Sequence, residues 1–324
     1  MSAVLAFQLQ NWFFFFHELI AGIAVGSLYA LIALGYTMVY GVLKLLNFAH
    51  GDVYMIGAYI GWFVLNALGS PLQPIMPIVP LFLLAFAASM LGCGVLGVVI
   101  ERFAYRPLRK APRIAPLISA LGVSFFLQQT AVLLWQANPR SYETFSLRPG
   151  KDGVGELFHN VVSWGNFQIQ YVQMVVILST VVLMLALSLF VWRTRTGKAM
   201  RAVSVDPEAA SMMGIDVDRV IAVTFLLGSA LAGAAGVMTG MIYQQLNPYM
   251  GFGAGLKAFI AAVVGGIGNI GGAVLGGLFI GLAETFTEGY LSSYFSDLIV
   301  FSVLIVFMLF RSTGLRGAPV LSKV

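Results

Sequence analysis

Charged residues are scarce in this chain. Only 10% of its 324 residues are charged and 59% are hydrophobic, giving a mean hydropathy of +0.91, whereas an ordinary soluble domain carries about 25% charged residues. No Asp, Glu, Lys or Arg occurs in residues 53–100, 114–139, 157–192 or 220–256. Each of these runs exceeds the roughly 20 residues that a helix needs to cross the hydrocarbon core. The sequence therefore predicts a polytopic helical membrane protein.

Cysteine and histidine are also rare. The single cysteine, Cys93, excludes an intrachain disulfide framework and a cysteine metal site. The three histidines (His17, His50 and His159) are far apart and fit no metal-ligand spacing. The chain also has no phosphate-binding G-x-x-x-x-G-K-[ST] loop and no G-x-S-x-G nucleophile motif. We therefore expect a protein that is not an enzyme and carries no cofactor or metal of its own.

The apolar segments predict an all-α fold, with residues 1–324 forming a single transmembrane domain. Eight segments qualify as candidate spans: residues 19–39, 48–65, 78–100, 114–135, 172–192, 220–243, 256–283 and 290–310. The fifth segment stands between two groups of elements. This arrangement permits an inverted repeat, which is a hypothesis at this point because the two halves have little sequence similarity.

The basic residues predict the orientation of the chain. Residues 101–113 contain five positive side chains and one acid, residues 193–219 contain five positive side chains, and the C-terminal tail has Arg311, Arg316 and Lys323 without an acid. The residues before position 19 contain no Lys or Arg, and the loop at 136–171 is balanced. The positive-inside rule therefore places both basic loops and the C-terminus in the cytoplasm and the N-terminus outside. Because the excess of Lys and Arg lies in the loops of a membrane protein, it does not indicate nucleic acid as a partner.

The predicted orientation requires an odd number of crossings, yet eight segments are present. Residues 265–272 read Gly-Gly-Ile-Gly-Asn-Ile-Gly-Gly, and glycine is costly inside a helix. We therefore expect the segment at 256–283 to be broken there into two elements. The G-x-G-x-x-G spacing within it lacks the strand, helix and acid of a dinucleotide site. Recurrent glycine pairs, such as Gly22/Gly26 and Gly277/Gly281, predict closely packed helices instead.

Residues 47–52, Asn-Phe-Ala-His-Gly-Asp, form the most informative polar cluster within the apolar segments. One interpretation is structural: Asn47 caps the next helix and Asp52 complements its positive end. The other is functional: Asn47, His50 and Asp52, together with Asn269 of the glycine-rich segment, line a translocation path, since ionisable groups at membrane depth are usually paired or hydrated. A proton relay from His50 to Asp52 is disfavoured, because residues two apart on a helix do not face each other.

The basic loop at 193–219 contains the signals of a short helix. Asp206 is a favourable N-cap, Pro207 suits the first helical position, Glu208 suits the positive end, and Gly214 suits the stop. They predict a helix over residues 207–213. Its Met212 and Met213 are adaptable apolar side chains, and Arg201 precedes it. The helix either lies on its own membrane domain or enters a groove on a soluble partner as a coupling helix.

Several long segments resemble the first permease subunit of branched-chain amino acid ABC importers. They are residues 30–41 (ALIALGYTMVYG), 46–59 (LNFAHGDVYMIGAY), 101–107 (ERFAYRP), 117–122 (LISALG), 196–202 (TGKAMRA), 213–215 (MGI), 218–225 (DRVIAVTF), 247–252 (NPYMGF) and 257–277. The family more often has Glu at the position of Asp52.

The resemblance implies a permease of the bacterial inner membrane that translocates leucine, isoleucine, valine or related amino acids. Its implied partners are a second related permease, two cytoplasmic ATPase subunits that bind ATP and Mg, and a periplasmic binding protein. In that family the loop matching residues 201–215 contacts the ATPase, which favours the coupling-helix interpretation. Alternatives are a permease of the same architecture for urea or short amides, and a proton-coupled secondary carrier.

Overall fold

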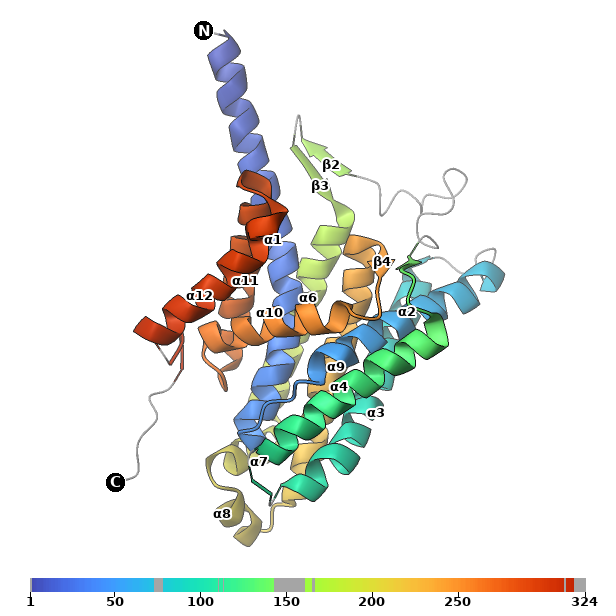
Figure 1. Cartoon of the computed structure of the whole chain (residues 1–324), viewed down its shortest axis with the longest axis vertical. Helices are drawn as coiled ribbons and strands as arrows, with labels where there is room; N and C mark the ends of the chain where they lie inside the picture. Colours follow the sequence, from blue (N-terminus) through green and yellow to red (C-terminus); the bar gives the residue numbers. More distant parts are fainter. Residues whose placement is uncertain are drawn as a thin grey trace.

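The computed structural model describes residues 2–72, 78–109, 111–112, 114–142, 161–164, 167–311 and 313–317. Figure 1 shows how its helices and strands are arranged. The helices are α1 (Ser2–Leu43), α2 (His50–Leu72), α3 (Ile78–Ile100), the short turns η1 (Glu101–Tyr105) and η2 (Arg106–Leu108), α4 (Ile114–Trp135), α6 (Tyr171–Arg193), α7 (Arg195–Val205), α8 (Pro207–Met212), α9 (Val217–Tyr243), α10 (Met250–Gly265), α11 (Ile270–Tyr290), η4 (Ser293–Phe295) and α12 (Ser296–Phe310).

Within the described residues, seven helices are long and apolar enough to cross a membrane, and α10 is a shorter apolar helix. These seven do not include α2, which has His50 and Asp52 in its first turn. The predicted helical fold is confirmed, with two small additions. β1 (Arg140–Ser141) pairs with β4 (Gln245–Leu246), and β2 (Val161–Trp164) pairs with β3 (Phe167–Gln170), both antiparallel.

The core is built on α1 and α9, the most enclosed of the apolar helices. Glycine lets their neighbours approach closely, as the recurrent glycine pairs predict. A methyl group on Gly281 of α11 would lie 2.2 Å from the Cα of Gly26 in α1. On the other side, a methyl group on Gly57 of α2 would lie 2.6 Å from the Cα of Gly233 in α9. Small residues at such crossings permit the backbone contacts on which helix packing in membranes depends.

The packing supports the inverted-repeat hypothesis. The first set is α1–α4 and the second is α9–α12, and equivalent helices make equivalent contacts. α1 packs along α11, and its counterpart α9 packs along α3; α2 contacts α4, and its counterpart α10 contacts α12. α6 belongs to neither set. α1 runs away from the N-terminal end of the molecule whereas α9 runs towards it (Figure 1). At the centre the first turns of α2 and α10 meet: a methyl group on Gly51 would lie 2.3 Å from the Gly251 carbonyl oxygen, and one on Gly251 would lie 2.7 Å from that of Gly51.

The glycine-rich segment is broken as predicted. α10 ends at Gly265, and α11 begins at Ile270. Gly266 and Gly268 between them have φ of +103° and +95°, a region that favours glycine. A side chain on Gly266 would also collide with the backbone of Gly317, because the C-terminal segment is hydrogen-bonded to the end of α10.

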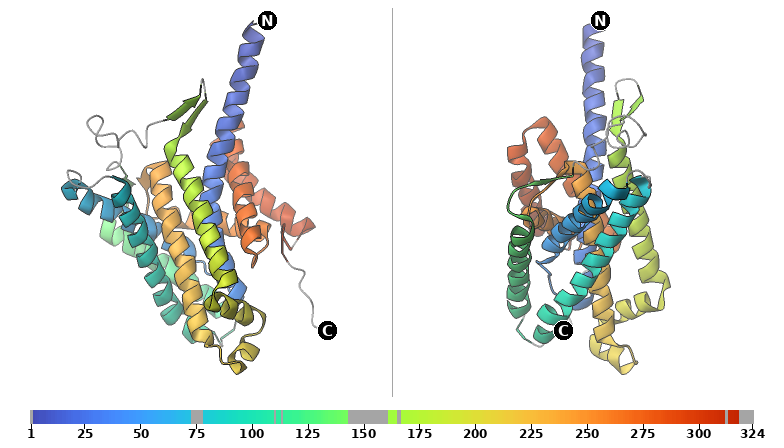
Figure 2. Two further views of the ribbon diagram at one scale, coloured as in Figure 1. Left: turned by 180° about the vertical axis from the view of Figure 1, so that it is seen from behind. Right: turned by 90° about the vertical axis from the view of Figure 1, so that its right-hand side faces the viewer.

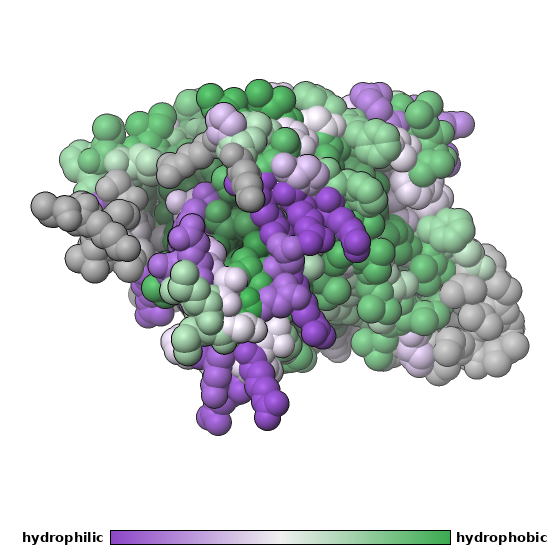
Figure 3. Space-filling model, turned by 90° about the horizontal axis from the view of Figure 1, so that it is seen from below, coloured by the Kyte–Doolittle hydropathy of each residue, from purple (hydrophilic) through white to green (hydrophobic). Residues whose placement is uncertain are grey.

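Both basic loops lie at the same end of the molecule, as the charge pattern predicts. η1 and η2 and the pair α7–α8 gather at the end opposite the N-terminus (Figures 1 and 2). Hydrophilic side chains cluster across this end when it is viewed directly (Figure 3). Three of the counted positive residues (Lys110, Arg113 and Lys323) and the loop at 143–160 fall outside the described residues.

Candidate functional site

The short helix predicted in the second basic loop is present as α8, and Asp206 caps it. The Asp206 carboxylate accepts hydrogen bonds from the backbone N–H groups of Glu208 (2.9 Å) and Ala209 (3.1 Å). Pro207 occupies the first helical position. These contacts satisfy N–H groups that a helix start would otherwise leave without acceptors.

The helix stops at Met212, one residue before the predicted end. Gly214 has φ of +82°, and its N–H donates to the Ser211 carbonyl (3.0 Å) while the N–H of Ile215 donates to the Ala210 carbonyl (3.1 Å). This pair of bonds is a Schellman motif, in which a left-handed residue, usually glycine, ends the helix. Both ends of α8 are therefore fixed by local hydrogen bonds.

α8 leaves most of its surface uncovered. Ala210 is its one buried residue, whereas Met212 and Met213 are 88% and 83% exposed and Val205 is 86% exposed. Glu208 is exposed beside them. The loop therefore presents adaptable apolar side chains on a charged end of the molecule, a composition suited to docking in a groove.

Arg201 has a different place from the rest of the predicted coupling residues. Its guanidinium donates to the Val191 carbonyl and lies 4.7 Å from the ring centroid of Trp192. Because both partners belong to the end of α6, Arg201 ties α7 to α6 rather than extending towards a partner.

The structure brings Asn47, His50 and Asp52 to the buried start of α2. The Asn47 side chain accepts a hydrogen bond from the Ala49 N–H and another from the Tyr105 hydroxyl, both at 3.1 Å. His50 is buried, with its ring 4.8 Å from that of Tyr36. The Asn47 side chain therefore stabilises the turn that leads into α2, and the cluster extends to residues that the local sequence does not indicate.

Asp52 is held by α4. Ser124 Oγ donates to one carboxylate oxygen, and Gln128 Nε2 donates to the other at 3.0 Å. All three side chains are buried. Among the described residues the Asp52 carboxylate is bonded to α4 and makes no hydrogen bond to His50. The two-residue spacing on one helix predicts this separation. Ser124 and Gln128 were missed at the sequence level, although two polar residues four apart on an apolar span share one helix face.

Asn269 lies elsewhere. It is exposed and caps α11 by accepting from the Gly272 N–H (3.0 Å), and its amide donates to the Arg316 carbonyl (3.1 Å). Its contacts join the glycine-rich connector to the C-terminal segment rather than to the cluster at α2.

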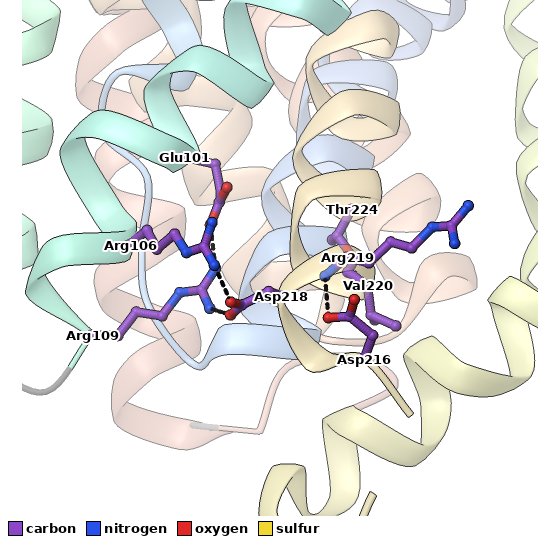
Figure 4. A network of polar contacts seen from close by, with 8 residues as sticks. All are labelled: Glu101, Arg106, Arg109, Asp216, Asp218, Arg219, Val220 and Thr224. Atoms are coloured by element: carbon purple, nitrogen blue, oxygen red, sulfur yellow. Dashed lines mark hydrogen bonds and ion pairs between the residues drawn. The ribbon is translucent and has the colours of Figure 1, made fainter. Parts of the chain in front are cut away.

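A charged network links the two basic loops (Figure 4). Asp218, in the first turn of α9, accepts from Arg106 and, at 2.5 Å, from Arg109. Arg109 also donates to Glu101, whose side chain is buried. The nearby Asp216 instead caps α9 by accepting from the Arg219 N–H at 3.1 Å. The sequence does not predict these pairs, because the proximity of two loops cannot be inferred from one sequence.

The site has no arrangement suited to a metal. Within the part of the chain that the structure describes, no group of three His, Cys, Asp or Glu side chains is placed to hold a metal ion. The candidate functional features are an exposed capped helix, a charged network behind it, and a buried polar cluster at a helix start.

Comparison with known proteins identifies the family. Residues 19–309 match the family described as "Branched-chain amino acid transport system / permease component". The high-affinity branched-chain amino acid transport system permease protein BraD of Pseudomonas aeruginosa is 44% identical over 310 residues, covering 96% of this chain and 98% of that protein. The permease protein LivH of Escherichia coli K12 is 43% identical over 319 residues, covering 97% and 99%. This chain therefore belongs to the permease components of the branched-chain amino acid transport systems.

Proposed function

We propose that this chain is a membrane permease subunit of an ATP-driven importer for leucine, isoleucine and valine. The observation that carries the proposal is the similarity to BraD and LivH, which extends over nearly the whole of each chain. The exposed, doubly capped α8 at the basic end of the molecule supports it, because a chain with no ATP-binding loop needs a surface through which another subunit can act.

The orientation that fits this function has the N-terminus outside and the C-terminus in the cytoplasm of a bacterial inner membrane. Support comes from the gathering of both basic loops at the end opposite the N-terminus (Figure 1), since cytoplasmic loops carry an excess of Lys and Arg. Seven of the described helices are long and apolar enough to cross a membrane, and counting α2 and α10 as well gives nine passes. Both numbers are odd, as the proposed orientation requires.

The partners that we propose are a second related permease, two cytoplasmic ATPase subunits that carry ATP and Mg, and a periplasmic amino-acid-binding protein. The surface proposed for an ATPase is centred on α8. Its residues are Asp206, Pro207, Glu208, Met212, Met213 and Gly214, with Arg201 bracing the preceding helix. Closure of the ATPases would displace α8 and so drive the exchange between outward- and inward-open states.

The residues proposed for the translocation path are Asn47, His50 and Asp52 at the start of α2, with Asn269 near the connector of α10 and α11. Support comes from the break in the helical backbone at both places. Irregular backbone at membrane depth is tolerated where it is buried in protein or lines a water-filled cavity.

The proposal is tested by uptake into proteoliposomes containing this chain, its partner permease and the two ATPases, with the binding protein outside. Labelled leucine should accumulate only with ATP inside, and excess isoleucine or valine should compete. ATP-dependent accumulation of labelled urea or acetamide, without accumulation of labelled leucine, would assign the same architecture to amides instead.

The role of α8 is tested by Gly214→Val in the same system. A β-branched residue at φ of +82° costs about 1–2 kcal/mol and displaces the end of the helix, so uptake per ATP hydrolysed should fall. Gly122→Ala is the matched control, because Gly122 has open space around it and lies in α4. Equal ratios in the two variants would remove α8 from the coupling surface.

A proton-coupled carrier using His50 is tested by His50→Met. The residue at the corresponding turn of α10 is Met250, so a methionine at position 50 removes the ionisable ring and leaves a side chain that the equivalent turn already carries. Uptake that continues with ATP and is insensitive to an uncoupler contradicts the carrier hypothesis. Uptake that persists without any ATPase subunit, and collapses with an uncoupler, would support it.

A further inference from the structure

The Asp218 network joins the coupling loop to the membrane-embedded helices. Asp218 lies four residues after Gly214, which ends α8, and α8 packs against α9. A displacement of α8 is therefore delivered to the first turn of α9 over a very short length of chain. From there the ion pairs to Arg106 and Arg109 lead into the other basic loop (Figure 4).

The next link is η1, a π-helical turn that continues α3. At its first residue, buried Glu101 accepts from Arg109. At its last residue, the Tyr105 hydroxyl donates to the carbonyl of Leu46 (3.2 Å) and to Asn47 Oδ1 (3.1 Å). The η1 turn thus contacts the charged network at one end and the residues that precede α2 at the other. π-helical turns are rare and occur frequently at functional sites.

Stability alone is a weak explanation for the Asp218 pairs. The side chains of Asp218 and Arg106 are 47% and 45% exposed, and ion pairs between exposed side chains contribute about 0–1 kcal/mol. The more enclosed member, Arg109, faces two carboxylates that belong to different elements, Glu101 of η1 and Asp218 of α9. The main effect of the network is therefore to fix the position of η1 relative to α9. Its contribution to the folding of either element is small.

We propose that Asp218 and Tyr105 are positioning residues that transmit the displacement of α8 to the turn at residues 44–49 before α2. Asp218 holds the basic loop to the start of α9, and Tyr105 carries the movement of that loop to Asn47. The inference rests on the proposed function, since it concerns how an importer of this kind couples ATP hydrolysis to opening of the path.

The test uses the complete importer in proteoliposomes and measures leucine uptake per ATP hydrolysed. Asp218→Asn removes the charge with little change in shape, and Tyr105→Phe removes only the hydroxyl. Each should lower the ratio by about 2- to 30-fold, the range for residues in a coupling network. The double variant should lower it no further than the more affected single variant, because both residues act in one chain of contacts.

Asp216→Asn is the matched control. It removes the same charge two residues away, and asparagine can still cap α9, so its ratio should stay at the wild-type value. The inference is overturned if Asp218→Asn behaves like Asp216→Asn, or if the effects of Asp218→Asn and Tyr105→Phe multiply. A wild-type importer that carries no leucine would instead contradict the proposed function.

Discussion

The starts of α2 and α10 are two versions of one backbone turn, separated by 200 residues. Asn47 accepts from the N–H of Ala49 at 3.1 Å, and Asn247 accepts from the N–H of Tyr249 at 2.8 Å. In both turns the N–H of the third residue after the asparagine donates to its carbonyl, at 3.1 Å. The two turns then meet through Gly51 and Gly251.

The side chains of the two turns differ although the backbone does not. The first carries His50 and Asp52, both buried, and the second carries Met250 and Phe252 at the same places, with Phe252 57% exposed. The shared backbone therefore belongs to the architecture, and the polar side chains belong to the first half alone. The two turns therefore differ in polarity and burial, not in backbone hydrogen bonding.

The largest expected effect comes from breaking the contact that both turns share. Gly51→Ala and Gly251→Ala each place a methyl group against backbone oxygen, at 2.3 and 2.7 Å. Overpacking of this kind should cost about 3 kcal/mol of the free energy of unfolding, measured by SDS titration in mixed micelles. Gly253→Ala in the same helix has open space and should stabilise α10 by about 0.5–1 kcal/mol. Similar losses in all three variants would contradict the close contact.

A smaller effect should follow from making the first turn apolar. Asp52→Leu leaves the Ser124 and Gln128 side chains buried without their acceptor, which should cost about 1–3 kcal/mol of unfolding free energy. At the equivalent place Phe252→Leu should cost less than about 1.5 kcal/mol, since Phe252 is exposed. Equal costs would mean that the two turns do not differ in the way their side chains indicate.

The smallest effect separates the two asparagine side chains. Asn247→Ala should cost about 0.5–1.5 kcal/mol of unfolding free energy, the net contribution of one hydrogen bond. Asn47→Ala should cost somewhat more, because Asn47 also accepts from Tyr105. The same titration measures both variants, and Asn47→Ala in a Tyr105→Phe background should lose that excess. An excess that survives in this background would have another source.

The predicted elements follow from local features of the sequence. Asp206, Pro207 and Gly214 define α8 to within one residue, because capping is decided by bonds within a few positions. The run at 265–272 indicates a break because glycine is costly inside a helix wherever it occurs. The placement of two Lys- and Arg-rich loops at one end follows from a rule about the Lys and Arg content of loops, which also needs no three-dimensional information.

The partners of Asp52 could not be predicted in this way. Ser124 and Gln128 lie 72 and 76 residues further along the chain, and Asp218 lies 112 and 109 residues from Arg106 and Arg109. The contacts of Asn269 and Arg201 could not be predicted either. Asn269 donates to the Arg316 carbonyl and Arg201 to the Val191 carbonyl, and no pattern in the sequence indicates these partners.

By itself the sequence determined that this is a helical membrane protein, where α8 begins and the glycine-rich segment breaks, and which loops share one side. These properties depend on hydropathy, capping and charge, which act over a few residues or one span. The tertiary structure alone decided which polar groups meet, because a buried carboxylate requires hydrogen-bond partners from whichever helix packs against it. For Asp52 that helix is α4, and for Glu101 the partner is Arg109 of the network that reaches α9.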